Sequence, residues 1–162
     1  MRGEITALTA VCCMNRLFYL AALDHQKPIL VEISSSGGLL AESLALARTM
    51  SDVGCPISTY SRGTVSGTAV VIAAHGRPGL RSAAPSARFR LTIPADEAHR
   101  GNSKDSLSVL KSSLVASLAR DTGKSEREVA AWIKGGVEFT AQQALANGLI
   151  DAIAGQPTPP PP

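Results

Sequence analysis

The sequence predicts an α/β fold with mostly parallel strands, because strand, turn and helix follow one another twice along the chain. A β-branched run is followed by a small-residue turn and an amphipathic helix, and the same order then recurs once along the chain. The length of 162 residues fits one domain. Hydrophobic residues make up 44% of the chain, so a full core can form without disulfides or metal ions.

The first unit begins with a helix expected over residues 5–23, because apolar residues recur there at helical spacing. Its apolar side comprises Leu8, Val11, Cys12, Leu17, Phe18 and Leu20. A strand is expected over residues 29–33, directly after Pro28. Residues 34–38 (SSSGG) then predict a turn, since serine and glycine favour turns over regular elements.

The second unit repeats this order with a helix over residues 39–53, which Gly54 is expected to end. A strand is predicted over residues 57–61, and a small-residue turn over residues 62–67. Residues 68–75 contain few polar atoms and predict a short buried helix. Two adjacent parallel strands would therefore each end in a glycine-bearing turn that leads into a helix.

The second half of the chain predicts a loop over residues 76–85 and a strand over residues 88–93. The polar segment 95–102 is expected to be exposed. A long helix is expected over residues 104–120, where leucines repeat three and four positions apart.

Two capping boxes predict two further helices near the carboxyl end. Ser125 with Glu128 begins the first helix, which Gly135 and Gly136 would close, and Thr140 begins the second. Residues 149–153 are expected to form a last short strand or turn. The domain would span residues 3–153, and the proline-rich residues 154–162 would form a disordered tail.

Composition argues against several classes of partner. The net charge is only +3, no run of five lysines or arginines occurs, and aromatic residues are 4% of the chain, so no nucleic-acid partner is expected. Cys12, Cys13 and Cys55 form neither a disulfide framework nor a metal-binding pattern, and we expect them to be buried thiols. No dinucleotide or phosphate-loop motif occurs, so no metal and no cofactor are predicted.

The apolar segment 5–23 contains Asn15 and Arg16, which interrupt it as a signal sequence or membrane span. A cytoplasmic chain without a membrane partner is therefore expected. Charged residues are only 18% of the chain, which is low for a protein that must cover its own surface. This low charge favours an oligomer, in which apolar surface is hidden between subunits.

The motifs resemble those of the ClpP peptidase family, the proteolytic subunit of Clp proteases. Residues 33–38 (ISSSGG) are similar to its strand-end motif INSPGG. Residues 63–76 (GTVSGTAVVIAAHG) are similar, without a gap, to its nucleophile segment GQAASMGAFLLAAG. Met50 stands where the family has a helix-end methionine.

The resemblance continues in the same order through the second half of the chain. Residues 85–88 resemble the family's PNSR, residues 122–123 part of its HTG, and residues 141–151 its APEAVEYGLVD. The match covers residues 3 to about 153. It implies the βαβ spiral, with mostly parallel strands, that ClpP shares with crotonase-like enzymes.

The resemblance also places the family's catalytic positions on this chain. Its serine nucleophile falls on Gly67, its general-base histidine on Thr92, and its aspartate on Gly136 or within one residue of it. Glycine has no side chain that could attack a carbonyl, and threonine cannot accept a proton at neutral pH. The family's two oxyanion donors are backbone N–H groups that match Gly38 and Thr68.

The resemblance therefore implies a catalytically inactive ClpP-like subunit with a structural or regulatory role in a ring assembly. The assembly would be a homo-oligomer or a hetero-oligomer with an active ClpP paralogue. The family's N-terminal hairpin and first helix, which gate the pore and help contact the ATPase ring, have no counterpart in this chain, so docking to an AAA+ ATPase is not favoured. Residues 94–122 are shorter than the matching handle region, which argues against the stacking of two rings.

Two other functions remain open from the sequence. The first is a crotonase-like acyl-thioester enzyme that uses the backbone oxyanion hole together with a carboxylate, for which Glu32, Asp96 and Glu97 are the candidates. The second is an atypical serine peptidase that uses Ser66 or a residue donated by another subunit.

The histidines give little support to a peptidase. We expect each of His25, His75 and His99 to be solvated or to be satisfied by ordinary hydrogen bonds rather than to act as a general base.

Overall fold

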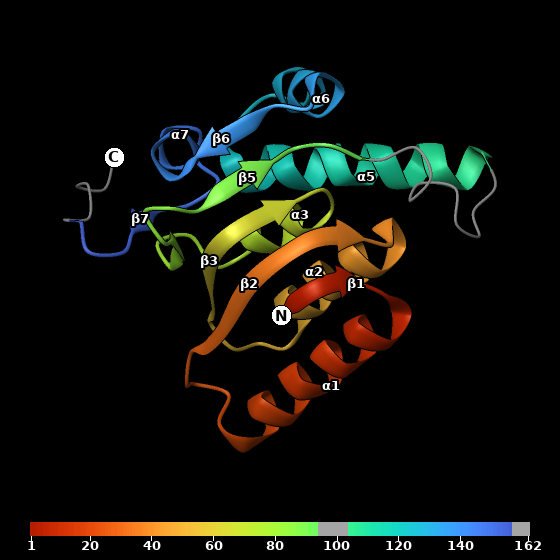
Figure 1. Ribbon diagram of the computed structural model, residues 1–162. Helices are drawn as coiled ribbons and strands as arrows, with labels where there is room; N and C mark the ends of the chain where they lie inside the picture. The colour runs from red at the N-terminus through yellow and green to blue at the C-terminus, as the bar shows by residue number, and fades with distance from the viewer. Residues whose placement is uncertain (94–103, 157–162) are drawn as a thin grey trace.

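A mostly parallel sheet forms the centre of the molecule, with strands in the order β1-β2-β3-β4-β7 (Figure 1). The computed structural model describes residues 1–93 and 104–156. Within these ranges the strands are β1 (Arg2–Ile5), β2 (Ile29–Gly38), β3 (Ile57–Ser66), β4 (Arg81–Ala83), β5 (Arg88–Arg90), β6 (Glu138–Thr140) and β7 (Ala152–Ile153). The helices are α1 (Ala7–Leu23), α2 (Leu40–Asp52), α3 (Ala69–Ala74), α5 (Lys104–Thr122), α6 (Glu126–Gly135) and α7 (Ala141–Ala146).

Strand β3 divides the sheet into two branches. One edge of β3 pairs in parallel with β2. Its other edge pairs with β4 through residues 59–61 and then with β5 through residues 64–66. Strand β4 continues to β7 in parallel, whereas β5 pairs with β6 in the antiparallel direction. The predicted α/β class with mostly parallel strands is confirmed.

Helix α3 is the most deeply buried helix of the described part of the chain. None of its six residues is more than 1% exposed, as expected from their apolar character. It packs against β2 and β3 on one side and against α2 and α5 on the other. Helix α1 packs on α2, and α6 packs on α5. Both capping boxes predicted from sequence are present, at Ser125 and at Thr140.

The amino-terminal helix is shorter than predicted. Residues 2–5 form strand β1, which pairs in parallel with β2, and Ile5 is fully buried opposite Gly38. Thr6 then caps α1, because its side chain accepts from the Thr9 N–H while the Thr9 side chain accepts from the Thr6 N–H. Apolar periodicity does not reveal this capping box, so the prediction that the helix begins at residue 5 is wrong by two residues.

The two predicted turns are also corrected by the structure. Residues 34–38 and 62–66 continue strands β2 and β3 instead of leaving the sheet. The register shifts between Ile33 and Ser35, and glycines with positive φ, such as Gly63 at +61°, permit the local bend. Strand β4 lies inside the predicted loop 76–85, and β6 was not predicted. Each of these two strands is only three residues long, too short to give a periodic pattern.

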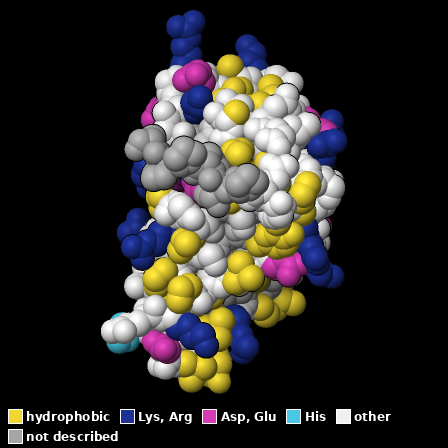
Figure 2. All heavy atoms as spheres, turned by 90° about the vertical axis from the view of Figure 1, so that its left-hand side faces the viewer, with side chains coloured by type: hydrophobic (Ala, Val, Ile, Leu, Met, Phe, Trp, Pro, Cys, Tyr) yellow, Lys and Arg dark blue, Asp and Glu magenta, His cyan; other side chains and the backbone are white. Residues whose placement is uncertain are grey.

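Much of the predicted apolar side of α1 points away from this chain's core, although Leu17 is buried and Leu20 packs against the core. Leu8 is 72% exposed and Phe18 is 53% exposed, and Val11 and Cys12 are exposed as well. Among the residues of α1, only Ala10 and Leu17 are buried. Figure 2 shows hydrophobic side chains gathered over the lower part of one face of the molecule, the level at which α1 lies in Figure 1. The expectation of a buried Cys12 is therefore wrong, whereas Cys55 is buried.

A buried ion pair joins β4 to the segment before β7. The Arg81 side chain is 7% exposed, and its Nε donates to Asp151 Oδ2 at 2.9 Å, while Nη2 donates to Oδ1. Its Nη1 donates to the carbonyl oxygens of Asp121, at 2.6 Å, and Ala74, at 3.2 Å. Burial raises the pKa of Asp151, but the hydrogen bonds and charge of Arg81 and the Gly79 N–H outweigh burial and lower the pKa below its ordinary value.

The predicted carboxyl tail begins in a turn. Residues 154–156 follow β7, and the Gln156 N–H donates to the Ile153 carbonyl. The rest of the predicted tail, residues 157–162, lies outside the described residues. The predicted polar segment 95–102 also lies outside them.

Candidate functional site

Gly67 stands at the turn between the end of β3 and the start of α3. A sharp strand-to-helix turn of this kind presents the nucleophile in several hydrolases. The backbone of Gly67 has φ of +58°, and its N–H donates to the Arg90 carbonyl at 2.9 Å. A Cβ built on Gly67 would lie 3.2 Å from the Ser36 carbonyl oxygen and 3.4 Å from that of Thr92. The strand-to-helix turn is thus present, but Gly67 offers no side chain there.

Thr92 and Gly136 line one open cleft of about 510 Å³ beside this turn. Thr92 follows β5, and Gly136 ends α6 in the left-handed conformation, with its N–H donating to the Ile133 carbonyl. Thr92 and Gly136 therefore share a cleft, and Gly67 approaches the Thr92 end of it through the Thr92 carbonyl oxygen. The cleft contains two cationic side chains, Lys111 and Lys134.

The two predicted oxyanion donors also lie beside this turn. The Gly38 N–H donates to Thr68 Oγ1 at 3.1 Å, and the same hydroxyl accepts from Ser43 Oγ at 2.8 Å. Thr68 is fully buried. The expected pair of open donors therefore needs a correction at Gly38, because a threonine side chain already occupies its N–H. The Thr68 nitrogen lies 2.9 Å from the position of a Cβ built on Gly37.

The alternative nucleophile Ser66 is the last residue of β3, where it pairs with Arg90. His25 lies in the exposed turn after α1, and His99 lies outside the described residues. His75 caps the far end of α3. A six-residue helix is about 9 Å long, so α3 keeps His75 away from Ser66.

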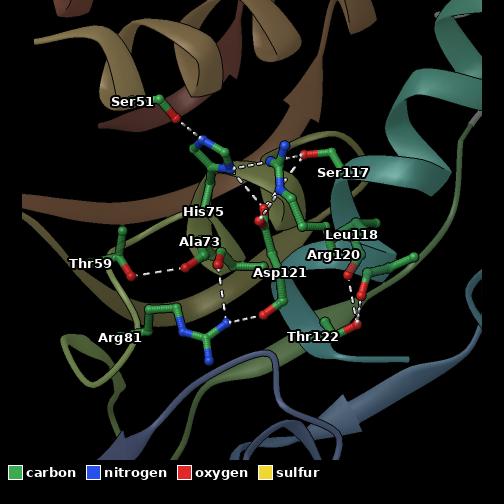
Figure 3. Close-up of polar contacts among 12 residues, drawn as sticks. Ser51, Thr59, Ala73, His75, Arg81, Ser117, Leu118, Arg120, Asp121 and Thr122 are labelled. Carbon is green, nitrogen blue, oxygen red and sulfur yellow. Dashed lines mark hydrogen bonds and ion pairs between the residues drawn. The ribbon is translucent and has the colours of Figure 1, made fainter. Parts of the chain in front are cut away.

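The structure brings His75 into a group that sequence reasoning missed. Its two ring nitrogens contact Ser51 of α2 and Asp121 of α5 (Figure 3). These residues are separated by 24 and 46 positions, and no local motif connects them. The expectation that His75 is satisfied by hydrogen bonds is confirmed, whereas its partners Ser51 and Asp121 were not predicted.

The carboxylates considered for acyl-thioester chemistry do not gather at the cleft. Glu32 lies on β2, where its Oε1 forms an ion pair with Arg62 Nη1 at 2.9 Å and accepts from Arg2 Nη2 at 3.4 Å. Glu32 does not line the cleft of Thr92 and Gly136. Asp96 and Glu97 lie outside the described residues. An ion-paired, remote carboxylate gives no support to acid–base catalysis at this site.

Within residues 1–93 and 104–156, no helix is both long and apolar enough to cross a bilayer. The same residues contain no cluster of three or more histidine, cysteine or acidic side chains that could bind a metal ion.

Comparisons with known proteins agree with the fold. A family model described as Clp protease matches residues 1–157. A Streptomyces coelicolor protein named putative ATP-dependent Clp protease proteolytic subunit-like is 36% identical over 152 residues, which cover 87% of this chain and 72% of the relative. The Arabidopsis thaliana ATP-dependent Clp protease proteolytic subunit-related protein 2, chloroplastic, is 33% identical over 147 residues, which cover 87% of this chain and 52% of that protein.

A solved structure gives the same result in three dimensions. The crystal structure of the ClpP protease catalytic domain from Plasmodium falciparum superposes with a TM-score of 0.87 at 26% identity. The superposition covers 99% of this chain and 86% of that chain. From the family match, the related sequences and the shared fold, we conclude that the chain belongs to the Clp protease family.

Proposed function

We propose that this chain is a ClpP-like subunit without peptidase activity, which has a structural or regulatory role in a ring assembly. It assembles with itself or with an active ClpP paralogue, in the cytoplasm. The single observation that supports this proposal most strongly is the composition of the site. Thr92 and Gly136 line the cleft, and Gly67 lies at the turn next to Thr92. These are the three positions where the family resemblance places base, acid and nucleophile.

The chemistry of these three residues explains why peptide hydrolysis is not expected. Acyl transfer from a peptide needs a nucleophilic side chain, a base that can accept its proton, and an acid that orients the base. Glycine supplies neither nucleophile nor acid, and a threonine hydroxyl is not a base at neutral pH. The partner of the Gly38 N–H, Thr68 Oγ1, further reduces the capacity to stabilise a tetrahedral oxyanion.

The exposed face of α1 supports the assembly part of the proposal. Leu8, Phe18, Tyr19 and Leu23 are each more than half exposed, and Leu30 of the neighbouring strand β2 is 63% exposed. Contiguous apolar surface of this kind is rarely left in water and is typical of subunit contacts. The names of the relatives, which are proteolytic subunits and a subunit-related protein, agree with a member of a larger complex.

A peptidase assay tests the catalytic part. The purified chain is incubated with small fluorogenic peptides, and no turnover above the buffer rate is expected. The proposal would be overturned if the chain cleaved the peptides, a serine-reactive phosphonate abolished the cleavage, and the Ser66→Ala variant did not cleave them. That outcome would instead support the atypical peptidase.

Light scattering tests the assembly part. We expect the chain alone, or mixed with an active ClpP paralogue, to give a particle several times its own mass of 16.8 kDa. A particle of subunit mass under both conditions would contradict a role in a ring. This result would leave the peptidase result unaffected, so the two parts of the proposal can fail separately.

A further inference from the structure

Three helices end together at the side of the molecule away from Gly67. Ser51 is the penultimate residue of α2, His75 caps the end of α3, and Asp121 is the penultimate residue of α5. These helices pack pairwise on one another, so their ends bring the three side chains to one place (Figure 3). None of the three residues belongs to the cleft of Thr92 and Gly136.

Hydrogen bonds connect the three side chains in a row. Ser51 Oγ lies 2.8 Å from His75 Nε2, and His75 Nδ1 lies 2.7 Å from Asp121 Oδ2. Arg120 Nη2 also lies 3.3 Å from His75 Nδ1. A carboxylate can only accept, so in the tautomer that satisfies the shorter contact with Asp121 the proton belongs to Nδ1. In the neutral ring, Nε2 then carries a lone pair that accepts from the Ser51 hydroxyl. This is the tautomer that a serine hydrolase requires.

The three side chains differ in their exposure to solvent. The side chains of His75 and Asp121 are 9% and 11% exposed, whereas Ser51 is exposed at the surface. Burial raises the pKa of Asp121, but hydrogen bonds from His75 and Arg120 and their charges outweigh burial and lower it. Arg120 Nε donates to Asp121 Oδ1 at 3.0 Å, so both carboxylate oxygens have partners.

Ser51 lines two clefts. A cleft of about 310 Å³ is lined by Leu44, Ala47, Arg48, Ser51, Asp52, His75, Ser117 and Arg120. A second cleft of about 430 Å³ also contains Ser51, His75 and Arg120. Leu44 and Ala47 offer an apolar wall for a short acyl chain. The guanidinium groups of Arg48 and Arg120, which pair with Asp52 and Asp121, are the positive charges nearest to an oxyanion that develops beside Ser51.

We propose that Ser51 and His75 form a second, separate site that hydrolyses carboxylic esters of short acyl chains, with Asp121 as the positioning residue. Ser51 Oγ attacks the acyl carbon, and its proton passes to His75 Nε2. The tetrahedral intermediate collapses with cleavage of the carbon–oxygen bond of the ester, and the leaving oxygen takes the proton from Nε2. Water then attacks acyl-Ser51, gives one proton to Nε2, and releases the carboxylic acid as Ser51 regains its proton.

Esters are favoured over peptides as substrates because of the donors present. The charges that face the oxyanion belong to arginine side chains, and those of Arg48 and Arg120 are 82% and 65% exposed. Exposed guanidinium groups reorganise with solvent and stabilise charge less than fixed backbone donors do. Ester cleavage needs less stabilisation because its leaving group is better than an amine. The inference thus remains compatible with a subunit that does not cut peptides.

The first experiment measures hydrolysis of p-nitrophenyl butyrate by the full chain after its thiols are blocked with iodoacetamide. Blocking is needed because Cys12 is exposed and thiolates attack activated esters. We expect Ser51→Ala to lose at least tenfold in rate. Ser113→Ala is the matched control, an exposed α5 serine whose hydroxyl only donates to the Val109 carbonyl among the described residues, and its rate should be unchanged. Full activity in Ser51→Ala would overturn the proposal.

Covalent labelling gives a readout that does not depend on a variant's folding. A fluorophosphonate should add its mass to the peptide that contains Ser51, and not to the peptide that contains Ser66. A label confined to Ser66 would overturn this site and also the peptidase-inactive subunit proposed above. A chain without any label would overturn only this site. The two proposals are thereby tested separately.

The role of Asp121 is tested through the tautomer of His75. Nitrogen-15 NMR of the His75 ring should show the proton on Nδ1 in the unmodified chain and a mixture of tautomers in Asp121→Asn, together with at least a tenfold loss of ester hydrolysis. A group that only held the three helix ends together would not require this tautomer for the reaction. Unchanged hydrolysis in a folded Asp121→Asn chain would contradict the positioning role.

Discussion

We expect Asp151→Asn to destabilise the fold strongly, because it breaks the ion pair with Arg81. The Arg81 side chain is 7% exposed and that of Asp151 is 20% exposed, so the guanidinium cannot reach bulk water when its partner is neutralised. The backbone N–H groups of Arg81 and Gly79 also donate to Asp151 Oδ2. The substitution therefore weakens several contacts between β4 and the segment before β7.

The magnitude follows from what remains around the guanidinium. Breaking a buried ion pair by removal of one partner costs about 3–5 kcal/mol. The carbonyl oxygens of Asp121 and Ala74 still accept from Arg81 Nη1, and the asparagine keeps one acceptor oxygen. These acceptors put the expected loss in the free energy of unfolding near the lower end, at about 3 kcal/mol. For a chain of this length the melting temperature should fall by roughly 6–12 °C.

Urea unfolding at fixed protein concentration measures this loss, with Asp52→Asn as the matched control. Asp52 pairs with Arg48 across one turn of α2 at 3.6 Å, but the two side chains are 58% and 82% exposed. Such exposed pairs contribute about 0.5 kcal/mol or less. Equal losses in Asp151→Asn and Asp52→Asn would refute the reasoning, because they would show that the Arg81 pair is not desolvated.

The remaining predictions concern acidification, the glycines at positions 67 and 136, and the exposed face of α1. The pKa of Asp151 is lowered by folding, so its contribution to stability is present above the unfolded-state pKa and is lost as pH falls through the folded pKa. The urea midpoint of the unmodified chain should therefore fall as the pH is lowered below about 5. The fall should be less steep in Asp151→Asn, and the same pH dependence of the midpoint in both chains would contradict this expectation. Gly67→Ala should cost about 2 kcal/mol and Gly136→Ala about 1 kcal/mol in urea unfolding, because both have φ near +60° but only Gly67 has carbonyl oxygens close to the new Cβ. Equal costs would show that the Gly67 turn relaxes freely. Phe18→Asp should lower the particle mass in light scattering, whereas Val109→Asp, an exposed control on α5, should not.

The sequence was sufficient to predict the long elements, because their periodicity is set by local residues. Helix α2 and the helices that begin at Ser125 and Thr140 were found from apolar spacing and capping boxes. Strands β4 and β6 were missed, since a three-residue strand is defined by its partners in the sheet rather than by its own pattern. The apolar side of α1 shows a related limit: apolar spacing indicates that a face avoids water, but not which chain covers it.

The candidate site was predictable only in part. The resemblance to ClpP indicated that Gly67, Thr92 and Gly136 belong together, and the cleft is consistent with that placement. Sequence reasoning could not show that the Gly38 N–H donates to Thr68 Oγ1, because the two residues are 30 positions apart. The contacts of His75 with Ser51 and Asp121 could not be predicted for the same reason. They arise from the packing of three helix ends, which leaves no spacing signature in the chain.

The branching of the sheet at β3 has an evolutionary consequence. The cleft lies beside the branch formed by β5 and β6, whereas the buried Arg81–Asp151 pair joins the branch formed by β4 and β7. Residues around the cleft can therefore change without disturbing the contacts that most strongly hold the other branch. Substitutions at the cleft can therefore accumulate while the chain still folds.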